Sequence, residues 1–187
     1  MPAPALVPIR FTARASMTGA IILRWDSNGN AAGDSIDGNN NWYRFATGPD
    51  RWLRVRHSVP DGAGGFDPQL RLEGDNPRLG ESPNTTLFTI MMSNVANQRD
   101  PVELLFDSPV RGVGVVFLPG KKQDFTAELE VFDDAHNSLA RVQRTSPDQG
   151  PVFLGAGFAT PQIFHVELDL VKRVPQGFRF SQLSILL

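Results

Sequence analysis

Strict alternation of apolar and polar residues in the second half of the chain constrains its fold most strongly. Phe125–Phe132 and Ile163–Leu170 both place an apolar side chain at every second position. A period of two puts the apolar side chains on one face of a strand and the polar ones on the other, whereas a helix needs a period of 3.6. We therefore predict antiparallel strands with one face in the core and one face in water.

Turn-forming residues divide the chain into short segments. The 187 residues include 17 glycines and 15 prolines, spread at turn-like intervals. Many short strands with frequent turns predict an all-β fold, an antiparallel two-sheet β-sandwich of jelly-roll type, and one domain over residues 1–187. The expected strands are Ile9–Arg14, Gly19–Trp25, Trp42–Ala46, Trp52–His57, Gln69–Glu73, Leu87–Met92, Val102–Phe106, Val110–Leu118, Phe125–Phe132, Leu139–Arg144, Val152–Phe158, Ile163–Leu170 and Phe178–Leu187.

Composition excludes several classes of site and partner. The chain has no cysteine, which rules out disulfides, thiolate metal ligands and cysteine nucleophiles. Its formal net charge is −2 and it carries no nucleic-acid-binding motif, so we expect no nucleic-acid partner. No stretch approaches the roughly 18 apolar residues of a membrane span, and no signal peptide is visible over Met1–Phe11.

Four stretches in the second half resemble one family of proteins. They are Phe106–Val115, Ala127–Asp133, Phe153–Ala156 and Ile163–Leu168. Together they resemble exported bacterial β-sandwich proteins, many of which carry the PEP-CTERM sorting tail. The sorting tail is absent here, and Ser181–Leu183 stands where that family often has an acidic pair. The resemblance implies a secreted or cell-surface protein with a jelly-roll-like fold, and it implies no defined activity.

Two patterns are compatible with hydrolysis. Gly33–Ile36 and the pair Asp133 and His136 resemble the Gly-Asp-Ser and Asp-x-x-His blocks of GDSL-type esterases. That chemistry needs a serine on a strand-to-helix turn, which an all-β chain does not offer. Glu128 and Glu130 share a strand face and could meet a glycosidase's carboxylate spacing. We predict no enzymatic activity, with hydrolysis as an open alternative.

Two sets of residues could bind metal. His165, Glu167 and Asp169 share one strand face and could hold an ion, although we interpret them as an ordinary solvated face. The loop from residue 26 to 37 has the ligand spacing of a calcium loop, but Ala31 replaces the turn glycine. We predict a calcium site there, with a solvated turn as the alternative. Its candidate ligands are Asp26, Asn28, Asn30, the Ala32 carbonyl, Asp34 and Asp37.

Two adjacent strands carry a group of tryptophans and arginines. We expect Trp42–Ala46 and Trp52–His57 to form a hairpin that sets Phe45 opposite Leu53, with a loop over Thr47–Arg51. Arg44 then lies opposite Arg54, a like-charge pair that needs carboxylates or an anionic partner. The candidate ligand-binding residues on the outer face of this hairpin are Trp42, Arg44, Trp52, Arg54 and Arg56.

These features favour a binding function over catalysis. Indole rings flanked by guanidinium groups suit a sugar ring that carries a carboxylate or sulfate. We therefore predict a non-enzymatic module that binds a glycan or another extracellular polymer, with an anionic polysaccharide as the favoured partner. The alternative is a purely structural β-sandwich subunit, such as a spacer or assembly protein. We expect Trp25 to lie in the core, and the alternative for Trp42 and Trp52 is that the second sheet or a loop covers their face.

Overall fold

The computed structural model of the protein describes residues 7–23, 25, 35–36, 43–48, 50–57, 70–73, 86–89, 101–119, 124–146, 148–171, 178–181 and 183–187. Within them, one 3-10 turn, η1 (Arg14–Ser16), accompanies fifteen strands. The strands are β1 (Ile9–Phe11), β2 (Ile21–Leu23), β3 (Ser35–Ile36), β4 (Tyr43–Gly48), β5 (Arg51–His57), β6 (Leu70–Glu73), β7 (Thr86–Thr89), β8 (Val102–Val110), β9 (Gly112–Pro119), β10 (Thr126–Phe132), β11 (Ser138–Thr145), β12 (Val152–Gly157), β13 (Ile163–Leu170), β14 (Phe178–Phe180) and β15 (Leu183–Leu186).

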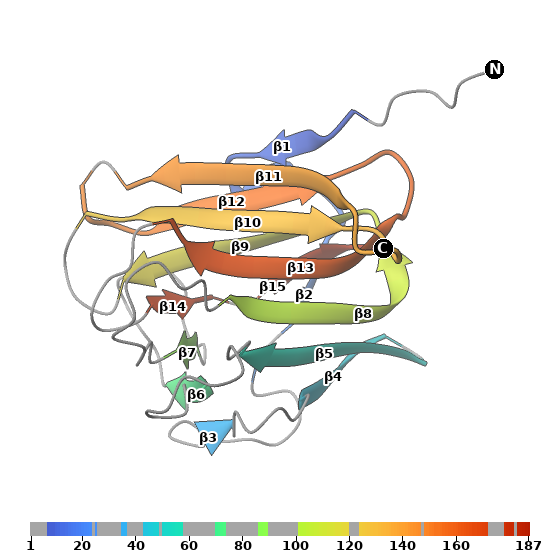
Figure 1. Ribbon diagram of the computed structural model, residues 1–187, viewed down its shortest axis with the longest axis horizontal. Helices are drawn as coiled ribbons and strands as arrows, with labels where there is room; N and C mark the ends of the chain where they lie inside the picture. The colour runs from blue at the N-terminus through green and yellow to red at the C-terminus, as the bar shows by residue number, and fades with distance from the viewer. Residues whose placement is uncertain are drawn as a thin grey trace.

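The strands form two antiparallel sheets packed face to face, which confirms the predicted β-sandwich (Figure 1). The six-stranded sheet has the order β11-β10-β13-β8-β5-β4. The nine-stranded sheet follows the order β1-β12-β9-β14-β7-β6-β3, with β15 beside β9 and β2 beside β15. The described residues include no helix long and apolar enough to cross a membrane.

Trp25 joins the two sheets at one end of the core, as the sequence predicted. Its side chain is fully buried, and its ring lies edge-on to Phe45 of β4 and Phe180 of β14, with centroids 5.4 and 5.5 Å away. Edge-to-face contacts of this kind favour aromatic pairs beyond the area they bury. The indole Nε1 donates a hydrogen bond to the Ser181 carbonyl at 2.7 Å, so the polar atom of this buried ring has a partner.

The last strand is broken where the sequence predicted one continuous strand over Phe178–Leu187. Both β14 and β15 pair with β9, but the ladder is interrupted at Ser181. The Ser181 hydroxyl accepts hydrogen bonds from the Val116 amide at 3.0 Å and from the Arg14 guanidinium at 2.8 Å. A side chain that bonds the neighbouring backbone competes with the strand ladder, and this explains the break.

The β4–β5 hairpin has the predicted register and a tighter turn than predicted. Phe45 pairs with Leu53, but Gly48 also pairs with Arg51, so the expected loop over Thr47–Arg51 is wrong. A register shift after Ala46 lets the ladder continue, and Asp50 has a left-handed φ of 54°. Asp is among the residues that tolerate this conformation in a tight turn.

Glycines that pair across β9 and β12 leave room for side chains to pack directly on the outer surface of the nine-stranded sheet. Gly114 pairs with Gly155, and Gly112 pairs with Gly157. A Cβ on Gly114 would lie 2.5 Å from both Met17 Sδ and the Phe153 ring. The absence of side chains at these positions is therefore a packing requirement.

We expect Gly114→Ala to lower the free energy of unfolding by about 1–3 kcal/mol, because the added methyl group overpacks this site. Urea denaturation measures the change. Gly150→Ala is the control, because no other part of the described residues lies within 4 Å of a Cβ at that position, and it should lose no stability. Equal stability of the two variants would contradict the proposed close packing.

Candidate functional site

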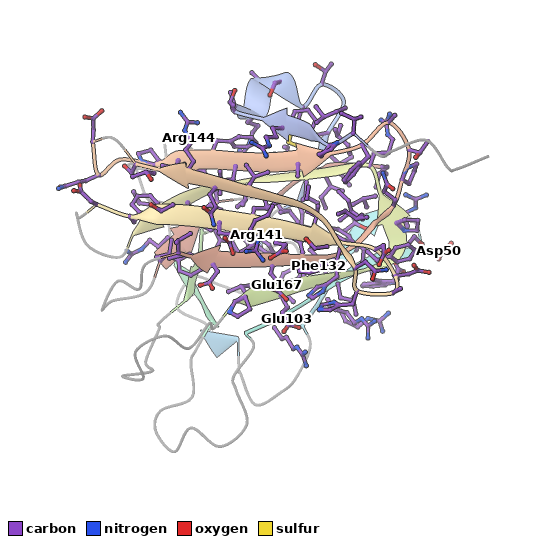
Figure 2. The ribbon with its side chains drawn as sticks, turned by 45° about the horizontal axis from the view of Figure 1, so that its top comes forward. Asp50, Glu103, Phe132, Arg141, Arg144 and Glu167 are labelled. Carbon is purple, nitrogen blue, oxygen red and sulfur yellow. The ribbon has the colours of Figure 1, made fainter. Side chains whose placement is uncertain are left out.

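The outer face of the six-stranded sheet carries a row of charged residues. The register aligns Arg141, Glu130, Glu167, Glu103 and Arg56 across β11, β10, β13, β8 and β5. Side chains directly opposite one another in adjacent antiparallel strands lie close together on the same face. Figure 2 shows Arg141, Glu167 and Glu103 along this line. The row therefore places three carboxylates between two guanidinium groups.

The two outer carboxylates of the row are held by ion pairs. Glu103 accepts a hydrogen bond from Arg56 Nε at 2.8 Å, and Nη2 of the same guanidinium forms an ion pair with it at 2.8 Å. Glu130 accepts bonds from Arg141 Nη2 at 2.6 Å and from the Ser138 hydroxyl at 2.6 Å. Charge-assisted bonds of this kind are about twice as strong as neutral ones and fix the geometry of both partners.

The expected solvated face is wrong at its centre. Glu128, Glu130, His165 and Asp169 are buried, although they point away from the core. Their strands, β10 and β13, have neighbours on both sides, and longer side chains from those neighbours close over the carboxylates. Gln143, for example, donates a hydrogen bond to Glu128. Alternation alone cannot reveal this, because it separates the two faces without showing what covers them.

A tight turn between β10 and β11 brings His136 onto this face. The Asp133 carboxylate accepts hydrogen bonds from the amides of Ala135 at 3.0 Å and Asn137 at 2.8 Å. The side-chain hydrogen bond from Asn137 is the main reason why the pKa of Asp133 lies below its ordinary value. The turn also holds His136 at a left-handed φ of 61°. Asx-turn bonding of this kind sets the direction of the His136 side chain.

Three aromatic rings stack where this turn meets the sheet. His136 lies parallel to Phe132 with centroids 4.6 Å apart, and His165 packs against both rings at 4.7 and 5.1 Å. Nδ1 of His136 and Nδ1 of His165 are 2.9 Å apart, within hydrogen-bonding distance. One of these nitrogens must carry a proton and the other must accept it, unless a cation lies between them.

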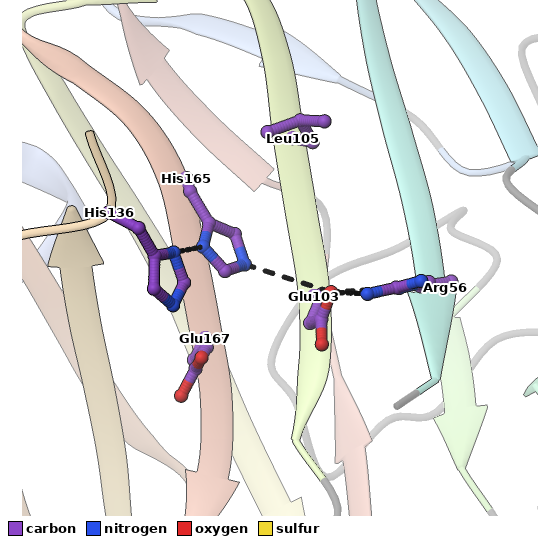
Figure 3. A pocket seen from close by; sticks show the side chains of 6 residues that line it. All are labelled: Arg56, Glu103, Leu105, His136, His165 and Glu167. Atoms are coloured by element: carbon purple, nitrogen blue, oxygen red, sulfur yellow. Dashed lines mark hydrogen bonds and ion pairs between the residues drawn. The ribbon is translucent and has the colours of Figure 1, made fainter. Parts of the chain in front are cut away.

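The histidines border a pocket of about 300 Å³ (Figure 3). Its lining residues are Arg56, Glu103, Leu105, His136, His165 and Glu167. His165 Nε2 is buried, has no hydrogen-bond partner among the described residues, and lies 3.9 Å from the Glu103 carboxylate. We name this the histidine pocket.

Burial lowers the pKa of His165 to about 4. The Glu103 carboxylate opposes this shift, whereas the charges of His136 and Arg56 add to it. At neutral pH the imidazole of His165 is therefore uncharged, the form in which histidine binds metal ions.

One group of residues in the described part of the chain could hold a metal ion. His136, His165 and Glu167 each offer a ligand atom, and these atoms lie within 4.8 Å of one another. Strand periodicity placed His165, Glu167 and Asp169 on one face, and the structure joins the first two to His136 instead. His136 was missed because it lies in a turn, outside the strand periodicity. The short Asp-x-x-His spacing was the available signal.

Four of the predicted ligand-binding residues lie on the same outer face, beside the histidine pocket. Arg44 pairs with Arg54, as the hairpin register predicts, and Arg54 also pairs with Leu105 of β8. Trp52 is 37% exposed, and the Arg44 guanidinium carbon lies 4.6 Å from the centre of its ring. We call Arg44, Trp52, Arg54 and Arg56 the arginine–tryptophan patch.

The remaining predicted site residues lie outside the described residues or on separate sheets. Trp42 and the calcium-loop residues Asp26, Asn28, Asn30, Asp34 and Asp37 lie outside the described residues, so that site stays a prediction. Of the esterase-like blocks, Ser35 lies in β3 at the edge of the nine-stranded sheet, whereas His136 lies on the other sheet.

Comparisons with known proteins give weak structural similarities. No family model matches the sequence, and no curated protein matches it significantly. The fold is similar to the enzymatically active domain of tailspike protein 4 from bacteriophage CBA120, with TM-score 0.42 and 12% identity over 72% of this chain and 19% of that one. It is similar to an arabinose-bound GH51 α-L-arabinofuranosidase, with TM-score 0.45 and 9% identity over 88% of this chain and 26% of that one.

A third similarity is to the CBM22-1 xylan-binding domain of Paenibacillus barcinonensis Xyn10C, with TM-score 0.38 and 12% identity over 84% of this chain and 97% of that one. The chain thus spans 19% and 26% of the tailspike and arabinofuranosidase chains. At these TM-scores and identities the similarities carry no argument about function. Any inference about function therefore rests on the residues of the chain itself.

We expect His165 to titrate near pH 4 in metal-free protein, measured by NMR of its ring carbons with a chelator present. An unfolded histidine titrates near 6.5, so between pH 6.5 and 4 the unfolded chain binds a proton that the folded chain does not. The uncharged His165 therefore costs the folded chain no stability above pH 6.5, and the free energy of unfolding falls as the pH drops from 6.5 towards 4. His165→Gln should lack this pH dependence. A measured pKa at or above 6.5 would show that burial does not control this group.

Proposed function

We propose that the protein is a non-enzymatic, secreted or cell-surface module that binds an acidic polysaccharide through the arginine–tryptophan patch. The observation that carries the proposal is the exposed Trp52 ring with the Arg44 guanidinium 4.6 Å from its centre. A flat apolar surface and a cation are thereby held side by side. A sugar that carries a carboxylate or sulfate offers the matching pair of groups.

The exposure of Trp52 supports a role in binding. Large aromatic side chains are usually mostly buried, and Trp25 of this chain follows that rule. Trp52 instead lies on the outer face of a sheet whose strands fix its position. A rigid aromatic surface loses little conformational entropy when a ligand stacks on it.

The arrangement of arginines supports an anionic ligand. Arg44 and Arg54 lie directly opposite each other on the outer face, and Arg56 follows on the same face of β5. Guanidinium groups form strong, charge-assisted hydrogen bonds with oxyanions such as carboxylates. This face therefore presents several groups that can bind an anionic ligand.

The carboxylates of the outer face support binding over hydrolysis. A glycosidase needs one carboxyl group as acid and another as nucleophile or base, both facing the substrate. Here Glu130 is bonded to Arg141 and Ser138, and Glu103 to Arg56. Both carboxylates are therefore engaged by neighbouring side chains of their own sheet.

Calorimetry and tryptophan fluorescence with polygalacturonate, heparin and neutral xylan test the proposal. We expect saturable binding of an acidic polymer, a fluorescence change on binding, and weaker binding at high salt because exposed charges are screened. Trp52→Ala and Arg44→Ala should each weaken binding about tenfold, which corresponds to about 1.4 kcal/mol.

Two controls lie on the nine-stranded sheet. Ile22→Ala removes an exposed apolar side chain and Arg10→Ala an exposed cation, and both should bind as the wild type does. Binding to neutral polymers alone would overturn the role of the arginines. No binding to any of the polymers, with a defined oligomer in light scattering, would favour a structural subunit instead.

A further inference from the structure

We infer that the histidine pocket is a zinc-binding site in which His136, His165 and Glu167 are the protein ligands. Each residue presents a ligand atom within 4.8 Å of the other two. In Figure 3 both imidazoles lie on the side of the pocket that Glu167 lines. The site does not depend on the proposed glycan binding.

The spacing of the two histidine nitrogens suits a shared metal ion. Their Nδ1 atoms are 2.9 Å apart. Two nitrogens bound to tetrahedral zinc at its usual bond length lie about 3.3 Å apart. The two nitrogens therefore need to move apart by only a few tenths of an ångström to bind one zinc ion. The stack of Phe132 against both imidazoles keeps the rings in this arrangement.

The environment of His165 Nε2 independently supports the same site. His165 is 7% exposed, and its Nε2 faces Glu103 at 3.9 Å without a hydrogen-bond partner among the described residues. A histidine that binds metal through one nitrogen usually donates its other N–H to a carboxylate. Metal on Nδ1 would place the proton on Nε2, and a small shift would complete this bond.

Glu103 is suited to that supporting role because it is already fixed. Arg56 holds its carboxylate with a hydrogen bond from Nε and an ion pair with Nη2, both at 2.8 Å. A charged carboxylate beside Nε2 increases the basicity of Nδ1 and orients the ring. Glu103 is thus a positioning residue and Glu167 a ligand.

The electrostatics of the row favour a cation at this point. Glu167 stands between Glu130 and Glu103 in the register, so it has a like charge on both sides. Each neighbour is paired with an arginine at the far side of the row. A divalent ion at Glu167 would lower the repulsion among the three carboxylates.

The ligand types select zinc over calcium. Imidazole nitrogens suit zinc and other late first-row ions, whereas calcium takes oxygen ligands only and more of them. His136 is exposed, which gives the ion a path to the site.

Zinc titration of the EDTA-treated full chain by isothermal calorimetry tests the inference. We expect one zinc ion per chain with a Kd of about 10 μM or tighter, and a higher melting temperature with zinc. His136→Asn preserves the left-handed turn and should weaken binding about 100-fold or more, because Asn tolerates that φ. Glu167→Gln should weaken it at least tenfold.

Three further measurements separate ligands from neighbours. Cobalt(II) should give a visible spectrum that His136→Asn abolishes. Glu103→Gln should weaken affinity about tenfold and leave that spectrum unchanged. Asp134→Asn, which alters an exposed carboxylate of the same turn, and Trp52→Ala should bind zinc as the wild type does. Absence of saturable one-to-one binding by the wild type, or unchanged affinity in both His136→Asn and Glu167→Gln, would overturn the site.

Discussion

The antiparallel register of β10, β13, β8 and β5 is the constraint on which the rest of the outer face depends. It aligns Glu130, Glu167, Glu103 and Arg56 in one row and places apolar partners such as Val131 and Val166 in the core. A shift by one residue would turn every side chain to the opposite face, so the hydrophobic core fixes the position of the charges. The candidate sites therefore inherit their geometry from packing on the far side of the sheet.

Burial changes the chemistry of this charged row. Carboxylates such as Glu128 and Glu130 lose water, and the cost of that loss is offset only where hydrogen bonds and opposite charges replace it. Arg141 and Arg56 do so at the two ends. At the centre, Glu167 stands between Glu130 and Glu103 and offers a ligand atom within 4.8 Å of those of both histidines, so a cation bound there would interact with the whole row. Stability and proposed metal binding therefore share one network.

The two proposed sites adjoin through Arg56, which lines the pocket and belongs to the arginine–tryptophan patch. They differ in physical character. The histidine pocket is a cluster of nitrogen and oxygen ligands on strand and turn, while the arginine–tryptophan patch is a surface of one ring and several cations. Trp52→Ala and His136→Asn act on different sites and so separate the two functions.

The sequence by itself determined the strands with clear alternation, the buried Trp25 and the pairing of Arg44 with Arg54, because a period of two assigns faces without any knowledge of the neighbours. Only the tertiary structure decided which polar side chains are buried, where the last strand breaks at Ser181, and that His136 joins His165. Each of these depends on contacts between segments far apart in the chain, such as Val116 with Ser181, or on the direction of a turn. Local periodicity carries no information about either.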